Sequence, residues 1–325
     1  MDIKDIQRQS IKMQQVYNMI LNLAPTDVTV LIQGEDGTEK EWVAESIHAH
    51  SSRRDKAFVV INCAAYPRSL LENELFGYAR GGNKKARYHK RGHLERADGG
   101  TVFLNDIDEV LPLSQVRLLK FLEAMEFERP GGGGKIRVNV RMITAADKDL
   151  KEEVEKGTFN EELYYRLSII NIYIPPLRQR KEDIPFWVEY FMERLSGEGK
   201  GVIKKITPKA MQFLMDYSWP GNVKELENTI QYAYLTTRDE LIDQDDLIPR
   251  LRNEVAREEK EGVISFEDNE KRFLLKMLRE ENWNKLQVAK KLKISRSTLY
   301  AKLKKYNLVS KPSSVAEGVR VNTKT

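Results

Sequence analysis

The sequence predicts an α/β protein in which a parallel sheet is flanked by helices and followed by purely helical segments. Short apolar, β-branched runs alternate with amphipathic stretches through the first half of the 325-residue chain. After Pro175-Pro176 the apolar residues recur only at helical spacing. Because parallel strands are joined by helical crossovers, this order indicates a sheet domain and then helical domains.

Four short runs bounded by turn residues are the predicted strands, and they span 28–33, 57–62, 101–105 and 140–145. One helix is expected over 40–50. Another is expected over 115–126, with an apolar side made of Val116, Leu119, Leu122 and Ala124. The four glycines at 131–134 predict a flexible turn between this helix and the next strand.

The second half of the chain predicts a helical subdomain and then a separate helical unit. Helices are expected over 182–195, 207–217, 222–236 and 243–247, with Thr207 and Asp243 as N-caps. The predicted domains are 1–176 for the sheet subdomain, 177–250 for the helical subdomain, 251–264 for a charged linker, 265–309 for the C-terminal unit and 310–325 for a disordered tail.

Composition excludes several classes of protein. With 41% hydrophobic and 32% charged residues the chain is typical of soluble globular proteins, and it contains no run of the ~18 apolar residues that a membrane span needs. The N-terminus lacks the apolar core of a secretory signal. The single cysteine, Cys63, predicts a buried thiol in a cytoplasmic protein. No metal site is expected, because the four histidines (His48, His50, His89 and His93) lack companion ligands at suitable spacing.

A glycine-bearing turn after the first predicted strand is the first candidate binding site. Backbone N–H groups at the start of a helix form an anion nest, and a lysine there can reach outer phosphates. The predicted nucleotide-binding residues are Gly34, Glu35, Asp36, Gly37, Thr38, Glu39, Lys40 and Glu41. On this segment alone, a plain strand-to-helix turn is the alternative.

The turn resembles the Gly-Glu-Ser-Gly-Thr-Gly-Lys-Glu loop in the AAA+ domain of sigma-54-dependent transcription activators, the bacterial enhancer-binding proteins. The resemblance runs from about Ile11 to Leu308 and continues in order through blocks at 62–65, 74–77, 96–104, 162–167, 175–178 and 219–223. It implies a P-loop AAA+ core with a parallel sheet, a helical lid subdomain and a C-terminal, all-α helix-turn-helix domain of Fis type. It also implies ATP or ADP as the cofactor.

Several positions depart from the family's ATPase motifs. Glu39 replaces the glycine before the lysine, where a carboxylate would repel phosphate. Asn105-Asp106 replaces the Walker B aspartate and glutamate, and we expect Asp106 to face away from Asn105 because neighbouring strand residues point to opposite faces. The first arginine finger is Asn160, and Arg166 keeps the second. The sensor positions carry Asp147 instead of asparagine and Lys224 instead of arginine.

These departures predict a core that does not hydrolyse ATP, since losing one arginine finger alone costs about 10³–10⁵ in rate. Binding of ATP or ADP stays open because Gly34, Gly37 and Lys40 remain. Mg²⁺ binding is disfavoured, and Asn62 is expected to have a structural role. The core is expected to be kept for self-association. The alternative function is an ATP-hydrolysing sigma-54 activator with unusual motifs.

The family's sigma-54-contacting loop, Gly-Ala-Phe-Thr-Gly-Ala, is replaced by Gly-Gly-Asn-Lys-Lys-Ala at 81–86, so a contact with sigma-54 polymerase is disfavoured. The surrounding segment 80–91 is basic through Arg80, Lys84, Lys85, Arg87, Lys90 and Arg91. Two interpretations remain. It is either a solvated, mobile loop or a contact for DNA phosphates or another acidic partner.

The C-terminal unit predicts a DNA reader. Between 284 and 305 there are eight basic residues and no acidic one. Leu299 and Leu303 face the core of a helix-turn-helix that resembles the Fis-type domain, whose recognition helix enters the major groove. Predicted base contacts are Arg296, Ser297 and Thr298, and predicted phosphate contacts are Tyr300, Lys302 and Lys291.

The function expected from the whole sequence is a sequence-specific, double-stranded-DNA-binding transcription regulator, acting as a repressor or antagonist. It would form a dimer through the helix-turn-helix and higher oligomers through the core. A basic three-helix unit with no DNA role and an architectural DNA-bridging protein are weaker alternatives.

If the basic loop contacts DNA, neutralising Lys84, Lys85 and Arg87 together will lower DNA affinity and flatten its dependence on salt, because fewer counterions are released on binding. Titration of an operator fragment at several salt concentrations measures both quantities. An unchanged affinity and an unchanged salt slope would leave the loop as a solvated surface segment.

Overall fold

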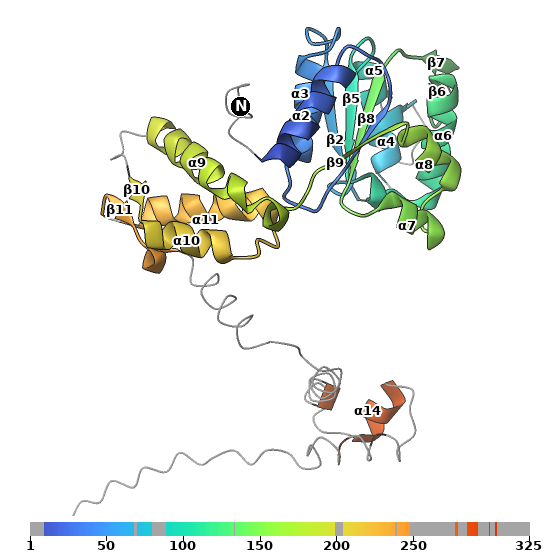
Figure 1. Ribbon diagram of the computed structural model, residues 1–325. Coiled ribbons are helices and arrows are strands. Elements are labelled where there is room, and N and C mark those ends of the chain that lie inside the picture. Colours follow the sequence, from blue (N-terminus) through green and yellow to red (C-terminus); the bar gives the residue numbers. More distant parts are fainter. Residues whose placement is uncertain are drawn as a thin grey trace, which may run out of the picture. The chain divides into compact units, whose positions relative to one another are not determined.

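The computed structural model divides into two compact units, 1–252 and 253–325. In the first it describes residues 10–67, 70–79, 89–132, 134–198, 204–237 and 239–247. In the second it describes 277–278, 285–291, 299 and 303. The first unit contains a sheet subdomain and a helical lid (Figure 1).

A five-stranded parallel sheet with the order β2-β5-β8-β1-β9 forms the centre of the sheet subdomain. Its strands are β1 (Val30–Gln33), β2 (Phe58–Asn62), β5 (Thr101–Asn105), β8 (Arg141–Ala146) and β9 (Ile170–Tyr173). Every residue of β5 and β8 is buried, which explains why their sequences are mostly apolar. The four predicted strands are confirmed, and the edge strand β9 was missed.

Helices cover both faces of this sheet (Figure 1). On one face α2 (Ile11–Leu23) and α3 (Lys40–Ala49) pack against Val30 and Ile32. On the other face α6 (Pro112–Ala124) and α8 (Glu161–Leu167) pack against Leu31. Neighbouring residues of β1 therefore enter different cores, as the two-residue strand period requires. The short helices α4 (Leu71–Phe76), α5 (His93–Arg96) and α7 (Leu150–Glu155) complete the subdomain.

Helix α6 starts three residues earlier than predicted, because Pro112 occupies its first turn. Its buried side includes Leu119 and Leu122, as expected. The expectation for Val116 and Ala124 was wrong, since both are exposed, and Leu118 and Phe121 are buried instead.

Two antiparallel hairpins decorate the sheet subdomain. The strands β6 (Glu126–Glu128) and β7 (Lys135–Arg137) pair across the glycine turn. The turn therefore joins two strands, whereas the sequence predicted that it would join a helix and a strand. Gly131, Gly132 and Gly134 have φ values of 92°, 95° and 81°, which glycine adopts without strain. The strands β3 (Gly77–Tyr78) and β4 (Lys90–Arg91) pair at the base of the basic loop, whose residues 80–88 lie outside the described part.

The lid begins with the 3₁₀ turns η2 (Leu177–Gln179) and η3 (Lys181–Asp183). It continues with α9 (Ile184–Glu198), α10 (Pro208–Asp216) and α11 (Asn222–Thr236), together with the short parallel pair β10 (Lys205–Ile206) and β11 (Leu241–Ile242). Thr207 caps α10 as expected, because its side chain accepts a hydrogen bond from the Ala210 N–H. The predicted helix at 243–247 is only a 3₁₀ turn, η4 (Gln244–Asp246), although Asp243 does form a capping box there.

In the second unit the described residues include one helix, α14 (Lys285–Lys291). Leu278, Val288, Leu299 and Leu303 have no exposed surface, which confirms that Leu299 and Leu303 face a core. Lys291 ends α14 and is exposed. The predicted DNA contacts Arg296, Ser297, Thr298, Tyr300 and Lys302 lie outside the described residues, as do the linker and the tail. None of the described helices is both long and apolar enough to cross a membrane.

Candidate functional site

The glycine-bearing loop lies at the carboxyl edge of the sheet, between β1 and α3, where ligands bind in open α/β sheets. Gly37 has a φ of 75°, and a Cβ atom there would lie 2.2 Å from the carbonyl oxygen of Gly221. Only glycine therefore allows the loop to pass this close to the lid. Thr38 closes the turn by donating its hydroxyl hydrogen to the Glu35 carbonyl at 2.7 Å.

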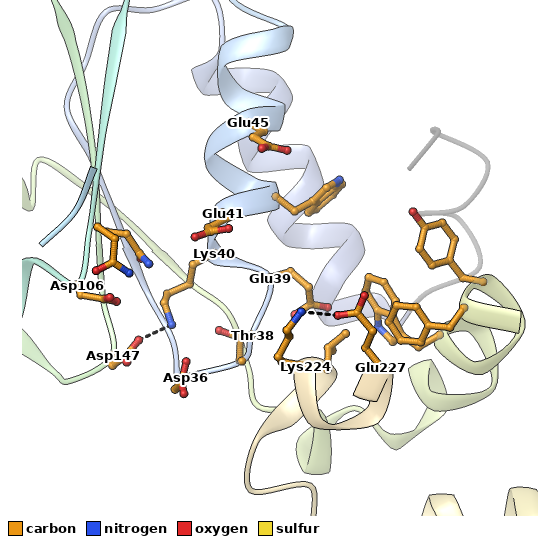
Figure 2. Close-up of a pocket in the computed structure, with 18 of the residues that line it drawn as sticks. Asp36, Thr38, Glu39, Lys40, Glu41, Glu45, Asp106, Asp147, Lys224 and Glu227 are labelled. Atoms are coloured by element: carbon orange, nitrogen blue, oxygen red, sulfur yellow. Dashed lines mark hydrogen bonds and ion pairs between the residues drawn. The ribbon is translucent and has the colours of Figure 1, made fainter. Parts of the chain in front are cut away.

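A cavity of about 600 Å³ opens beside this loop, a volume suited to a small ligand or cofactor (Figure 2). Its lining from the sheet subdomain includes the loop residues from Asp36 to Glu41 and, further on, Asn62, Asn105, Asp106 and Asp147. Its lining from the lid includes the aromatic residues Trp187, Tyr190 and Phe191 and the charged residues Arg194, Lys224 and Glu227. The sheet subdomain thus contributes mostly polar side chains, and the lid contributes three aromatic rings together with three charged side chains.

Lys40 lies at the polar side and is only 4% exposed. Its ammonium donates hydrogen bonds to the carbonyl oxygens of Gly34 at 2.9 Å and Glu35 at 3.0 Å. The same group lies 2.5 Å from Oδ1 of Asp147, so the residue at the sensor position forms an ion pair with the loop lysine. Figure 2 shows this pair on the sheet side of the cavity.

Asn105 and Asp106 both line the cavity, so the expectation that they face opposite sides was wrong. The alternation ends because β5 ends at Asn105, and Asp106 takes left-handed backbone angles (φ 56°, ψ 46°). Burial first, and then the charge of Asp147, raises the pKa of Asp106. Oδ1 of Asn105 is buried with no hydrogen-bond partner. Asn62 interacts with Asp106 and also accepts a hydrogen bond from the Ala65 N–H at 2.8 Å.

The donors at this end fit Mg²⁺ poorly, because Asn105 offers an uncharged amide oxygen where a carboxylate would be required. Among the described residues, no group of three or more His, Cys, Asp or Glu side chains could hold a metal ion. Cys63 is buried at the end of β2, and burial raises the pKa of its thiol to about 12. The thiol therefore stays protonated near neutral pH.

The residues at the arginine-finger positions and at the second sensor position interact with nearby residues of the protein. Asn160 caps α8 by accepting a hydrogen bond from the Leu163 N–H at 2.8 Å. Arg166 is half exposed, lies 3.8 Å from the Glu123 carboxylate and is absent from the described lining of the cavity. Lys224 lines the cavity but is 67% exposed and pairs with Glu227 at 2.8 Å.

The sequence suggested that Glu39 would present an unpaired carboxylate to the loop, but this carboxylate is paired. Its oxygens accept hydrogen bonds from the Arg180 guanidinium at 2.5 and 2.7 Å, and neither side chain is more than 5% exposed. Arg180 also reaches Asp183 at 3.5 Å, and Asp183 accepts hydrogen bonds from the N–H and hydroxyl of Ser10. Burial raises the pKa of Asp183. The Glu39 charge is therefore neutralised within the protein.

Two more contacts tie the loop to the lid, and sequence reasoning missed both. Glu35 forms a two-pronged ion pair with Arg178 at 2.5 and 2.6 Å. The buried Asn222 donates to the Asp36 carbonyl at 2.8 Å and accepts from the Leu177 N–H at 2.9 Å. The only signal for Arg178 and Asn222 was their place in family blocks, because their partners lie more than 40 residues away in the sequence.

Comparisons with known families match three successive parts of the chain. Residues 6–173 match the Sigma-54 interaction domain, 178–263 the AAA+ ATPase lid domain, and 265–306 the bacterial regulatory protein, Fis family.

Individual proteins are similar over most of the chain. The transcriptional regulatory protein ZraR of Salmonella typhimurium is 44% identical over 90% of this chain and 66% of its own length. The regulatory protein AtoC of Escherichia coli is 40% identical over 88% of this chain and 64% of its own. The chain thus spans slightly less than two thirds of these relatives. Crystal structures of NtrX from Brucella abortus with ATP and with ADP are 34% and 32% identical, each with a TM-score of 0.69, and cover 91% of this chain and 68% of NtrX.

The buried pair of Glu39 and Arg180 generates a prediction about stability. Glu39→Gln removes the charge that compensates a fully buried guanidinium, so we expect the free energy of unfolding to fall by about 3 kcal/mol. Urea unfolding of the nucleotide-free protein measures the loss. The matched control is Glu35→Gln in the same loop, whose ion pair is about 40% exposed and should cost less than about 1 kcal/mol. Equal losses in the two variants would contradict the assignment.

Proposed function

Because the chain belongs to the sigma-54 interaction domain family, we propose that it is a sequence-specific DNA-binding transcription regulator with a hydrolysis-deficient AAA+ core. The core would bind ATP or ADP in the cavity beside Lys40. The helix-turn-helix would bind double-stranded DNA, and the chain would self-associate. The domain boundaries set out from the sequence, such as 265–309 for the DNA reader, are part of this proposal.

Nucleotide binding is supported by the cavity and by the loop that borders it. The loop keeps the glycines and the lysine that suit phosphate, and α3 begins at Lys40 with its N–H groups directed at the loop. The aromatic side chains of the lid offer an apolar surface at a distance from the polar side, as a base and a phosphate chain would need. NtrX from Brucella abortus, a protein of the same fold, has been crystallised in complex with ATP and with ADP.

A single observation carries the proposed loss of hydrolysis. Asn105 stands at the carboxyl end of β5 and lines the same cavity as Lys40, with a buried amide oxygen that has no partner. An uncharged amide neither attracts a divalent cation strongly nor polarises a water molecule as a carboxylate does. Asn160 adds to this loss, because a helix cap replaces the cationic side chain that would stabilise a developing phosphate charge.

An ATP-hydrolysing sigma-54 activator is the second candidate. It is favoured by Asp106, whose carboxylate lines the cavity and could accept a proton from water. Arg166 is also half exposed, as a residue that acts on a neighbouring protomer must be. This candidate needs a contact with sigma-54, which is disfavoured because residues 81–86 lack the family's sigma-54-contacting sequence.

DNA binding is supported by the match of residues 265–306 to the Fis family and by the local excess of positive charge. The exposed Lys291 ends α14, where its ammonium can reach a phosphate. Two such units would read a two-fold symmetric site, so a dimer through this domain and larger assemblies through the core are part of the proposal.

Hydrolysis by the full chain with Mg²⁺, ATP and operator DNA should not exceed that of Lys40→Ala. We expect this because the carboxylate at position 105 and the arginine at position 160 are both missing. A coupled phosphate-release assay measures the rate, and ATP titration in parallel shows that the wild-type protein is occupied. Turnover clearly above the Lys40→Ala background would favour the activator.

Arg296→Ala should weaken binding to the preferred operator by about 1–3 kcal/mol and relax sequence preference, because a base contact is lost. Competition binding against operators with single substitutions measures both effects. Lys291→Ala is the control, since a lost phosphate contact weakens all sequences equally and reduces the salt slope by about one. A uniform loss in Arg296→Ala would make Arg296 a backbone contact.

A further inference from the structure

The ammonium of Lys40 already holds an anion that belongs to the protein. It has three N–H donors, and three acceptor atoms lie within 3.0 Å: the carbonyl oxygens of Gly34 and Glu35 and Oδ1 of Asp147. Two of these acceptors are neutral backbone groups. A phosphate that approaches Lys40 must therefore compete with the Asp147 carboxylate for the same cation.

A second carboxylate increases the negative charge at this end of the cavity. Asp106 and Asp147 both line it, and burial first, and then the charge of Asp147, raises the pKa of Asp106. Figure 2 shows Asp106 and Asp147 on the same side of Lys40.

The whole lining shows the same imbalance. Seven acidic and three basic residues line the cavity, which is a formal charge of −4. Even without Glu39, whose charge Arg180 neutralises, acids outnumber bases by three. The two basic residues from the lid, Arg194 and Lys224, both pair with Glu227. Among the basic residues of the described lining, Lys40 alone therefore remains to offset both Asp106 and Asp147, and it already pairs with Asp147.

We propose that the cavity is selective for a nucleoside diphosphate over the corresponding triphosphate, and that Asp147 is the residue that rejects the third phosphate. In phosphate-binding loops of this kind the lysine reaches the outer phosphates, so a third phosphate is the group placed nearest the two carboxylates. Like charges within one cavity repel each other, and partial burial weakens the screening of that repulsion by solvent. The inference rests on the proposed nucleotide binding and adds a preference to it.

This preference fits a core that does not turn over. A site that holds the diphosphate remains in one nucleotide state, and its occupancy depends only on ligand concentration. Ligand binding would then stabilise the folded core by mass action, and a cycle of binding and hydrolysis would not be needed.

Isothermal titration of the full chain with ADP and with ATP, both in EDTA, tests the proposal. We expect ADP to bind at least about tenfold more tightly than ATP. Asp147→Asn keeps the shape and removes the charge, so it should strengthen ATP binding more than ADP binding and bring the two affinities within about threefold.

Asp149→Asn is the matched control. Asp149 precedes α7 in the same loop and caps it by accepting a hydrogen bond from the Lys151 N–H at 2.8 Å, a role that asparagine also performs. This variant removes one negative charge two residues away and should keep the wild-type ratio of affinities.

Each outcome decides something different. ATP binding as tightly as ADP to the wild-type protein would overturn the selectivity, and an unchanged ratio in Asp147→Asn would overturn the role of that residue. If the titrations of the wild-type protein with ADP and ATP are the same as those of Lys40→Ala and show no binding, the proposed nucleotide binding itself is wrong.

Discussion

The fully buried guanidinium of Arg180 is the constraint on which the arrangement of the first unit depends. A charge without solvent contact must be compensated, and its partners come from three separate segments: Glu39 in the loop, Asp183 at the start of the lid, and Ser10 through Asp183. The loop, the lid and the N-terminal cap of α2 are thereby held together at one point. The cavity lies directly beside this point, since Glu39 also lines it, so the buried cluster connects the parts of the protein that form its walls.

Several residues that depart from the family motifs make contacts within the protein, and Glu39 makes its contact with Arg180. Glu39 replaces a glycine, but its φ of −82° is accessible to any residue, and its charge is taken up by Arg180. Asn160 replaces an arginine and caps α8. Asp147 replaces an asparagine and pairs with Lys40. Each of the three residues now present thus makes a contact inside the protein, which is a reason for the fold to persist if the chemistry is lost as proposed.

The sequence predicted those parts of the fold that local patterns determine. Short, largely apolar runs marked four of the five strands of the sheet. Thr207 and Asp243 marked the starts of α10 and η4 through the chemistry of their own side chains. The edge strand β9 was missed: it has four residues, of which only Ile172 is buried. For the site, the loop and most lining positions were predicted, but the pair of Glu39 and Arg180 spans 141 residues. No local period encodes such a contact. The alternation rule failed for Asp106 because it applies only while the strand continues.

The core proposed to lack ATP hydrolysis can still determine how well the proposed regulator binds DNA. A helix-turn-helix of about 45 residues is a small unit, and units of this size have a marginal hydrophobic core and a limited contact surface. Joining two of them through a larger associating core makes the second binding event intramolecular, so the effective concentration rises without any new contact with DNA. The stability of the core and its occupancy by nucleotide would then act on DNA affinity through association. On this view the buried pair that holds the core together contributes to DNA recognition, although it lies outside the DNA-reading unit.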